Sequence, residues 1–221
     1  DAIGLFFIPT LPHKNKDILD VHKTHLITGK IKGNVILDEL GRYLKKNKIF
    51  NFYNNKEKKI FENIYDHQND NENKKEFKKI MNYYGSLNLK HKILNYLLNI
   101  FDINMTVKKY YLSIKEIKYI SSLGMIVGSH SDSHIPLSRL SYRKQFLEIK
   151  KSKIFLQKLI NKEIETFCYP FGGKKSYNLN TIRILKKLKF KLAYSVEHRS
   201  ITKKDLEKNP LELPRYDCNQ F

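Results

Sequence analysis

The chain has 221 residues, 41% of them apolar, and a formal net charge of +20, which excludes an overall disordered chain and allows a buried core. No stretch approaches the roughly 20 consecutive apolar residues of a membrane helix, so we expect no transmembrane segment. Only 6 of the 42 basic residues are arginine, and the lysines are scattered among asparagines. We therefore attribute most of the charge to solvated helix faces and expect no nucleic-acid partner, whereas an acidic sugar is compatible with it.

The N-terminal part of the chain begins with an apolar run at residues 3–8 that predicts a strand. No signal-peptide pattern precedes it, and the localisation stays open. Residues 10–20 are expected to form a polar loop, followed by a helical stretch that contains His22 and His25. We interpret these two histidines as titratable surface groups, and a place at the top of a barrel is the alternative.

Residues 31–111 are rich in Lys, Asn, Glu and Tyr, with apolar residues at helical spacing. We interpret them as a helical insertion between a first strand and loop (residues 1–30) and the remainder of the same domain (residues 112–221). Residues 63–75 are almost entirely polar and are expected to form a mobile connection. Five tyrosines of this region fit a core better than a sugar-stacking surface, although both interpretations stay open: Tyr83, Tyr84, Tyr96, Tyr110 and Tyr111.

After residue 112, strands and helices alternate. A helix is expected to begin after Ser113, which forms a capping-box pattern with Glu116, and to end at Gly124. Strands are predicted at 125–127, 166–169 and 192–196, helices at about 141–160 and 179–188, a charged loop at 197–209 and an extended segment at 211–219. This alternation predicts an α/β fold with parallel strands, whose chemistry lies on the loops that follow the strands.

Two histidines four residues apart, His130 and His134, follow the strand at 125–127 in a polar loop. Two imidazoles at this spacing can bind one ion, and a histidine pair with a carboxylate from elsewhere and water is a familiar catalytic zinc arrangement. The same spacing also occurs by chance, so two solvated or structurally hydrogen-bonded side chains are the alternative. Zinc or another divalent metal is the expected cofactor.

Two stretches carry a family resemblance: Gly128-Ser129-His130-Ser131-Asp132-Ser133-His134 and Thr166-Phe167-Cys168-Tyr169-Pro170-Phe171-Gly172-Gly173. Together with the strand at residues 3–8, they resemble the polysaccharide deacetylases of carbohydrate esterase family four. The resemblance implies an irregular seven-stranded (β/α) barrel with a helical insertion. It also implies a metal-dependent hydrolase that removes N-acetyl groups from a sugar of a polysaccharide or surface glycan, or from a sugar precursor.

The resemblance also implies roles for individual residues. His130 and His134 would be metal ligands, and the backbone N–H near Phe171 would contact the oxyanion. The expected substrate-binding residues are Tyr169, Pro170, Phe171, Gly172 and Arg215. Arg215 could instead form a surface salt bridge with Asp217.

The sequence departs from the family at its first motif. The Asp-Asp strand that supplies the catalytic base and the third metal ligand is not present in this chain. Cys168 stands where an arginine orients the base in the family, and a buried thiol is its ordinary interpretation. We therefore expect this chain alone to be inactive on N-acetylated sugars, and the alternative function is a non-catalytic carbohydrate-binding relative. The sugar, its linkage, the metal and the oligomeric state stay open.

Overall fold

The structure is a computed structural model that describes residues 2–66 and 68–216. The chain forms two compact units, which are described separately. Unit 1 comprises Asp1–Asp17 and Tyr110–Phe221, and unit 2 comprises Ile18–Lys109. Unit 2 starts before residue 31, because the helix that precedes this residue packs against later helices of the unit, and the insertion at 31–111 stays a prediction.

Unit 1 is built on a parallel sheet whose described strands follow the order β1-β2-β3-β4. These strands are β1 (Leu5–Ile8), β2 (Ile126–Ser129), β3 (Thr166–Cys168) and β4 (Leu192–Tyr194). Leu213 adds a parallel bridge beside Tyr194 at the β4 edge. The predicted α/β fold with parallel strands is confirmed. The described residues provide four strands, so the closed seven-stranded barrel stays a prediction.

The longer helices of unit 1 begin and end close to where the sequence predicts them. They are α7 (Ile114–Ser122), α8 (Tyr142–Ile160) and α9 (Leu179–Lys187). The predicted capping box is present at the start of α7, where Ser113 and Glu116 exchange hydrogen bonds. Beyond the end of α7, Gly124 has a φ of 83°, which a glycine adopts without steric cost.

Two segments expected to be loops contain short helices. The segment at 10–20 includes α1 (Leu11–Asn15), which has Pro12 in its first turn, a position where proline is favourable. The segment at 197–209 includes α10 (Lys203–Lys208), which begins at a capping box formed by Thr202 and Asp205. Both loop predictions were wrong, because they relied on the polar and charged composition of the segments and gave too little weight to the helix-start signals at Pro12 and Thr202.

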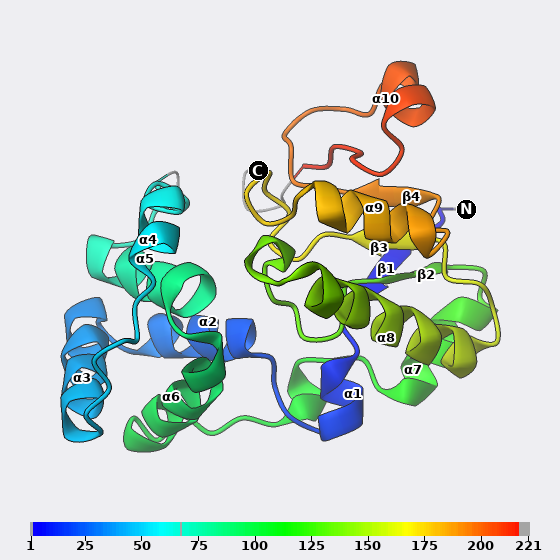
Figure 1. Cartoon of the computed structure of the whole chain (residues 1–221). Helices are drawn as coiled ribbons and strands as arrows, with labels where there is room; N and C mark the ends of the chain where they lie inside the picture. The colour runs from blue at the N-terminus through cyan, green and yellow to red at the C-terminus, as the bar shows by residue number, and fades with distance from the viewer. Residues whose placement is uncertain (1, 67, 217–221) are drawn as a thin grey trace. The chain divides into compact units, whose positions relative to one another are not determined.

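The core of unit 1 lies between the sheet and the helices on one of its faces. Val127, Phe167 and Ala193 point from β2, β3 and β4 into an apolar cluster that also contains Ile149 of α8 and Ile184 of α9. In Figure 1, α8 and α9 run across this side of the sheet. Burial of each Val, Ile or Phe side chain in this cluster contributes about 1.5–3 kcal/mol. This burial stabilises the packing of α8 and α9 on the sheet.

On the other face of the sheet, the strands approach one another closely at Gly128. A Cβ atom at this position would lie 2.5 Å from both the Phe7 ring and the Thr166 hydroxyl oxygen. The Phe7 and Tyr194 rings are themselves 5.4 Å apart. A glycine is therefore needed immediately before the loop that carries the histidine pair.

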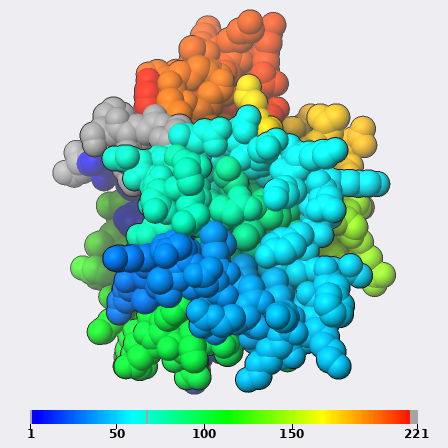
Figure 2. Space-filling view, turned by 90° about the vertical axis from the view of Figure 1, so that its left-hand side faces the viewer, coloured from blue at the N-terminus to red at the C-terminus, as the bar shows by residue number. Residues whose placement is uncertain are grey.

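Unit 2 consists mainly of helices. They are α2 (Asp20–Lys30), α3 (Gly33–Lys46), α4 (Asn55–Ile60), α5 (Glu72–Lys79), the π-helix η1 (Ile80–Tyr84) and α6 (Leu87–Ile100). The connection expected at 63–75 is shorter than predicted, because the Asn71 side chain caps α5. Figure 2 shows one face of this unit, on which the segments from α2 to α4 are coloured blue to cyan. Among the described helices, none is both long and apolar enough to cross a bilayer.

Tyrosines fill the interior of unit 2. Tyr83 and Tyr84 are 3% and 1% exposed, so the core interpretation holds for both. The Tyr65 ring lies 5.7 Å from that of Tyr83, and burial raises the pKa of Tyr65 to about 12. Tyr96 is half-buried and donates a hydrogen bond of 2.6 Å to Glu39. These rings stabilise the unit from inside, whereas Tyr110 is 41% exposed, so the sugar-stacking interpretation stays open for that residue.

Two lysines of unit 2 lie inside the unit instead of on a solvated helix face. Lys23 and Lys90 are 1% and 3% exposed. Lys23 Nζ donates to the side chain of Asn95 over 2.7 Å, and Lys90 Nζ donates to that of Asn82 over 3.4 Å. The long aliphatic stems pack in the core while the amides accept from the ammonium groups. For these residues the solvation expectation was wrong.

Candidate active site

Contacts among the loops that follow the strands define the candidate site. The loops after β1 and β2 meet where the Leu11 N–H donates to the Asp132 carbonyl over 2.9 Å. The loops after β2 and β3 meet at His130. The loop after β3 is joined to the end of β4, because the Val196 N–H donates to the Gly172 carbonyl over 2.8 Å. All four loops lie at the carboxyl end of the sheet, where the sequence predicts the chemistry.

The two histidines expected to bind a metal lie next to each other in the loop after β2. The rings of His130 and His134 have centroids 4.6 Å apart and planes inclined by 78°. His130 Nδ1 lies 2.7 Å from the carbonyl oxygen of Cys168. Because a carbonyl oxygen only accepts, Nδ1 carries the proton and the ring's lone pair is on Nε2. This hydrogen bond therefore selects the tautomer that can bind a metal through Nε2.

The backbone of both loops adopts unusual conformations around the histidines. Ser131, His134 and Phe171 have φ values of 61°, 56° and 64°, in the left-handed region that costs about 1–3 kcal/mol for a residue other than glycine. The Ser131 hydroxyl oxygen accepts from the His134 N–H over 3.1 Å. The Phe171 ring lies 5.1 Å from the His134 ring. Phe171 therefore lies beside His134, and the oxyanion contact of its backbone stays a prediction.

Asp132 lies between the two histidines in the sequence and is 5% exposed. Its Oδ1 accepts from the Thr10 hydroxyl over 2.5 Å and forms an ion pair with Lys14. Both partners come from the segment just after β1. The Asp132 carboxylate thus joins the histidine loop to the segment that follows β1.

The donor set at the histidines fits part of a metal site. Neutral imidazole is a common ligand of zinc and other divalent metals, and the His130 tautomer is suitable. Within residues 2–66 and 68–216, no group of three or more His, Cys, Asp or Glu side chains could hold a metal ion. The described residues therefore offer two imidazoles, and a bound ion would complete its coordination with water or other ligands.

The expected substrate residues of the loop after β3 are mostly buried. Tyr169 is completely buried, its hydroxyl donates to the Leu211 carbonyl over 2.6 Å, and its ring stacks on Tyr177 with centroids 3.9 Å apart. Its side chain is therefore part of the core in this structure and is not placed to contact a substrate. Pro170 and Gly172 are also buried, whereas Phe171 is half-buried. Gly172 has a φ of 71° and no room for a Cβ atom beside Val196.

Arg215 lies beside Cys168. The Cys168 thiol is buried, which raises its pKa, and the Arg215 guanidinium opposes that rise. Arg215 Nε is buried, with no hydrogen-bond partner among the described residues. The suggested partner Asp217 lies outside the described residues. The thiol thus contacts a guanidinium that comes from the C-terminal segment.

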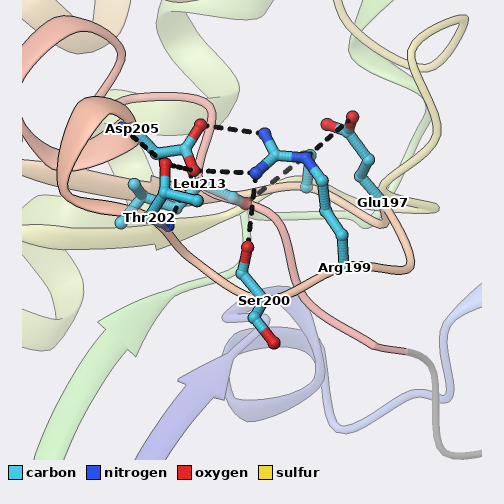
Figure 3. A network of polar contacts seen from close by, with 7 residues as sticks. Glu197, Arg199, Ser200, Thr202, Asp205 and Leu213 are labelled. Carbon is cyan, nitrogen blue, oxygen red and sulfur yellow. Dashed lines mark hydrogen bonds and ion pairs between the residues drawn. The ribbon is translucent and has the colours of Figure 1, made fainter.

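A polar network orders the loop after β4 (Figure 3). Arg199 donates to both oxygens of Asp205, over 2.7 and 2.8 Å, and to Glu197 over 3.2 Å. The Thr202 hydroxyl and N–H also donate to Asp205, over 2.6 and 2.8 Å. These hydrogen bonds, chiefly those from Arg199, hold the pKa of Asp205 well below its usual range. His198, in the same loop, is exposed.

A cavity of about 540 Å³ lies at the opposite end of the sheet from the histidines. Its lining includes Met125, Ile126, Thr166 and Leu192, which belong to the amino ends of β2, β3 and β4. The Thr166 hydroxyl is buried without a hydrogen-bond partner among the described residues. The described lining contains no histidine or cysteine, and its carboxylates Glu163 and Glu165 form ion pairs with Lys153 and Lys191, so the candidate site is assigned to the histidine loop.

Sequence reasoning missed three residues that shape the histidine loop: Thr10, Lys14 and Glu148. Thr10 and Lys14 directly follow β1, and polar residues after a parallel strand are a usable signal. Glu148 lies within a long amphipathic helix. Its spacing in the sequence gives no sign of a contact with Ser133.

Residues 90–193 match the polysaccharide deacetylase family model. The match covers a little less than half of the chain and includes His130, His134 and Phe171. The family resemblance predicted from the sequence is thus confirmed over this part of the chain. No curated protein matches the chain.

Several solved structures are similar to this chain. A polysaccharide deacetylase from Bacillus cereus has 24% identity and a TM-score of 0.42 over 52% of this chain and 33% of its own. The Streptococcus pyogenes deacetylase PplD in complex with acetate has 17% identity and a TM-score of 0.44 over 97% and 91%. A pseudoenzyme of the same carbohydrate esterase family from Bacillus anthracis has 19% identity and a TM-score of 0.33 over 36% and 27%. The chain thus spans about a third of the length of the Bacillus cereus protein.

Proposed function

We propose that this chain carries the histidine side of a metal-dependent deacetylase site that acts on an N-acetylated sugar of a polysaccharide or surface glycan. The observation that carries the proposal is the adjacent His130–His134 pair, with His130 Nδ1 hydrogen-bonded to the Cys168 carbonyl, inside the segment that matches the deacetylase family. A divalent metal, zinc above all, is the proposed cofactor. The seven-stranded barrel is proposed as the complete form of the four-stranded sheet.

In this proposal each candidate site residue has a defined role. A bound zinc ion would lower the pKa of its water and polarise the acetyl carbonyl. His130 and His134 would hold the ion through neutral imidazoles. The Phe171 backbone would contact the oxyanion, and Arg215, which lies beside Cys168, would bind the substrate. Because both histidines would hold the ion, the general base would have to be a carboxylate outside the pair. General-base catalysis typically raises the reaction rate by about 10²–10⁴-fold.

The experiment measures zinc binding by the chain and by a His130→Ala/His134→Ala variant, through competition with a chromogenic chelator. We expect weak, stoichiometric binding that the double variant loses. A His91→Ala/His198→Ala variant is the matched control, since it also removes two histidines, both exposed, and it should bind zinc as the unmodified chain does. Equal binding by all three proteins would show that the pair is not a metal site.

Acetate release from N-acetylglucosamine oligomers separates catalysis from binding. The zinc-loaded chain alone is expected to release none, because both imidazoles would be occupied as metal ligands and neither could act as the base. Release that depends on His130 would show that the chain alone supplies every group that catalysis requires, including a base. Binding of the oligomers without release would favour the non-catalytic carbohydrate-binding alternative.

A further inference from the structure

The histidine loop is tied to α8 by a carboxylate that the proposed reaction does not use. The Glu148 side chain accepts two hydrogen bonds from Ser133: the backbone N–H donates to Oε2 over 2.8 Å and the hydroxyl donates to Oε1 over 2.8 Å. Ser133 immediately precedes His134. Both carboxylate oxygens are thus engaged by the residue next to one proposed ligand.

A second contact from the same helix lies next to the other proposed ligand. The Ser129 hydroxyl donates to the Ser152 hydroxyl over 2.9 Å, and both serines are completely buried. Ser129 immediately precedes His130. Glu148 and Ser152 are four residues apart on α8, so they share one face of the helix. One helical face therefore contacts the chain directly before each of the two histidines.

The loop needs such support because its own backbone does not favour the observed shape. Ser131 and His134 both adopt left-handed conformations, which non-glycine residues hold only when surrounding contacts impose them. Between them, Asp132 is tied to the segment after β1. Without the Glu148 contact, the part of the loop nearest His134 would lose its two hydrogen bonds to α8.

We propose that Glu148 is a positioning residue that holds the loop in the conformation in which His130 and His134 bind one metal ion. The inference rests on the proposed function for the metal and on the two Ser133 hydrogen bonds for the geometry. Residues that orient metal ligands through hydrogen bonds typically change metal affinity by 10–100-fold when they are removed. Glu148 acts here through the backbone of the loop and through its position on a rigid helix.

The test compares Glu148→Ala, Glu148→Gln and the control Glu163→Ala. A glutamine can accept from the Ser133 N–H and donate to the Ser133 hydroxyl oxygen, so it preserves the contact without the charge. Glu163 lies three residues after the end of α8, and its side chain is 72% exposed. Zinc affinity is measured by chelator competition, thermal stability by melting of the metal-free protein, and loop order by amide hydrogen exchange at residues 131–134.

We expect Glu148→Ala to weaken zinc binding about 10-fold or more and to accelerate exchange at residues 131–134, with Glu148→Gln restoring most of both. Glu163→Ala should change neither. Zinc affinity within twofold of the unmodified chain in Glu148→Ala would overturn the proposal. So would an equal loss of affinity in Leu156→Ala, a buried α8 variant that lowers the melting temperature, because the role would then be general stability.

A failure of the proposed function gives a different result. If the unmodified chain binds no zinc, the metal site is wrong, and the positioning role toward a metal falls with it. The exchange measurement then decides the contact itself: faster exchange confined to residues 131–134 in Glu148→Ala keeps the tie between α8 and the loop, and unchanged exchange rejects it.

Discussion

The two units bury hydrogen-bonding groups for different purposes. In unit 2, the buried Lys23 and Lys90 donate to the amide side chains of Asn95 and Asn82, because a buried ammonium group without a partner would cost several kcal/mol. In unit 1, the buried pair Ser129 and Ser152 and the Ser133–Glu148 contact lie directly beside the histidine loop. The comparison teaches that satisfied polar groups stabilise packing in unit 2, whereas in unit 1 they fix the geometry of a candidate site.

The same contrast governs what each unit reveals in its sequence. Chemistry restricts residue type, so the loop with His130 and His134 is recognisable from a few letters. Packing restricts mainly size and polarity, since many apolar combinations fill a core. Unit 2 therefore shows helical spacing but no motif that names a function.

The largest expected effect sharpens the division of roles between the units. Ile93 of α6 is completely buried, so Ile93→Ala should lower the free energy of unfolding by about 2–5 kcal/mol, as measured by urea denaturation. Zinc affinity of the folded protein should stay unchanged, because every contact described for the histidine pair lies in unit 1. Ile149→Ala on α8 is the matched variant of unit 1. A loss of zinc affinity in Ile93→Ala would break the comparison.

The sequence predicts most of unit 1 and the position of its site. Periodicity and capping signals locate β2, α7, α8 and α9, because apolar alternation and capping reflect local physics. The core position of Tyr169 could not be predicted, since nothing local shows that its hydroxyl reaches Leu211. The contact between Glu148 and Ser133 also joins residues that are 15 positions apart in the sequence, one in α8 and one in the histidine loop. Such pairings depend on how helices pack on the sheet, which a single sequence does not encode locally.

A smaller effect concerns the pH response of unit 2. Burial, and to a lesser extent His25, lowers the pKa of His22 to about 4. The neutral ring is thus favoured in the folded state, and this contribution is complete above the unfolded pKa of about 6.5 and declines as the pH falls toward 4. Between pH 7 and pH 5 the chain should lose about 2 kcal/mol that His22→Gln does not lose, measured by urea denaturation. The exposed His91→Gln is the control, and an identical pH slope in His22→Gln would refute the assignment.

The smallest expected effect tests whether polar contacts beside the unit 1 loops also contribute to stability. Asp205 accepts from Arg199 and Thr202 (Figure 3), and its pKa is depressed in the folded state. Its contribution is therefore present above the unfolded pKa of about 4 and is lost as the pH falls through the lower folded value. Asp205→Asn should lower the urea midpoint at pH 7, and its difference from the unmodified chain should shrink below pH 4. Glu207→Gln, on the same helix but in an exposed pair with Lys203, should leave the midpoint unchanged; a difference for Asp205→Asn that persists undiminished at low pH would show that the asparagine disturbs packing and that the ionised carboxylate is not the cause.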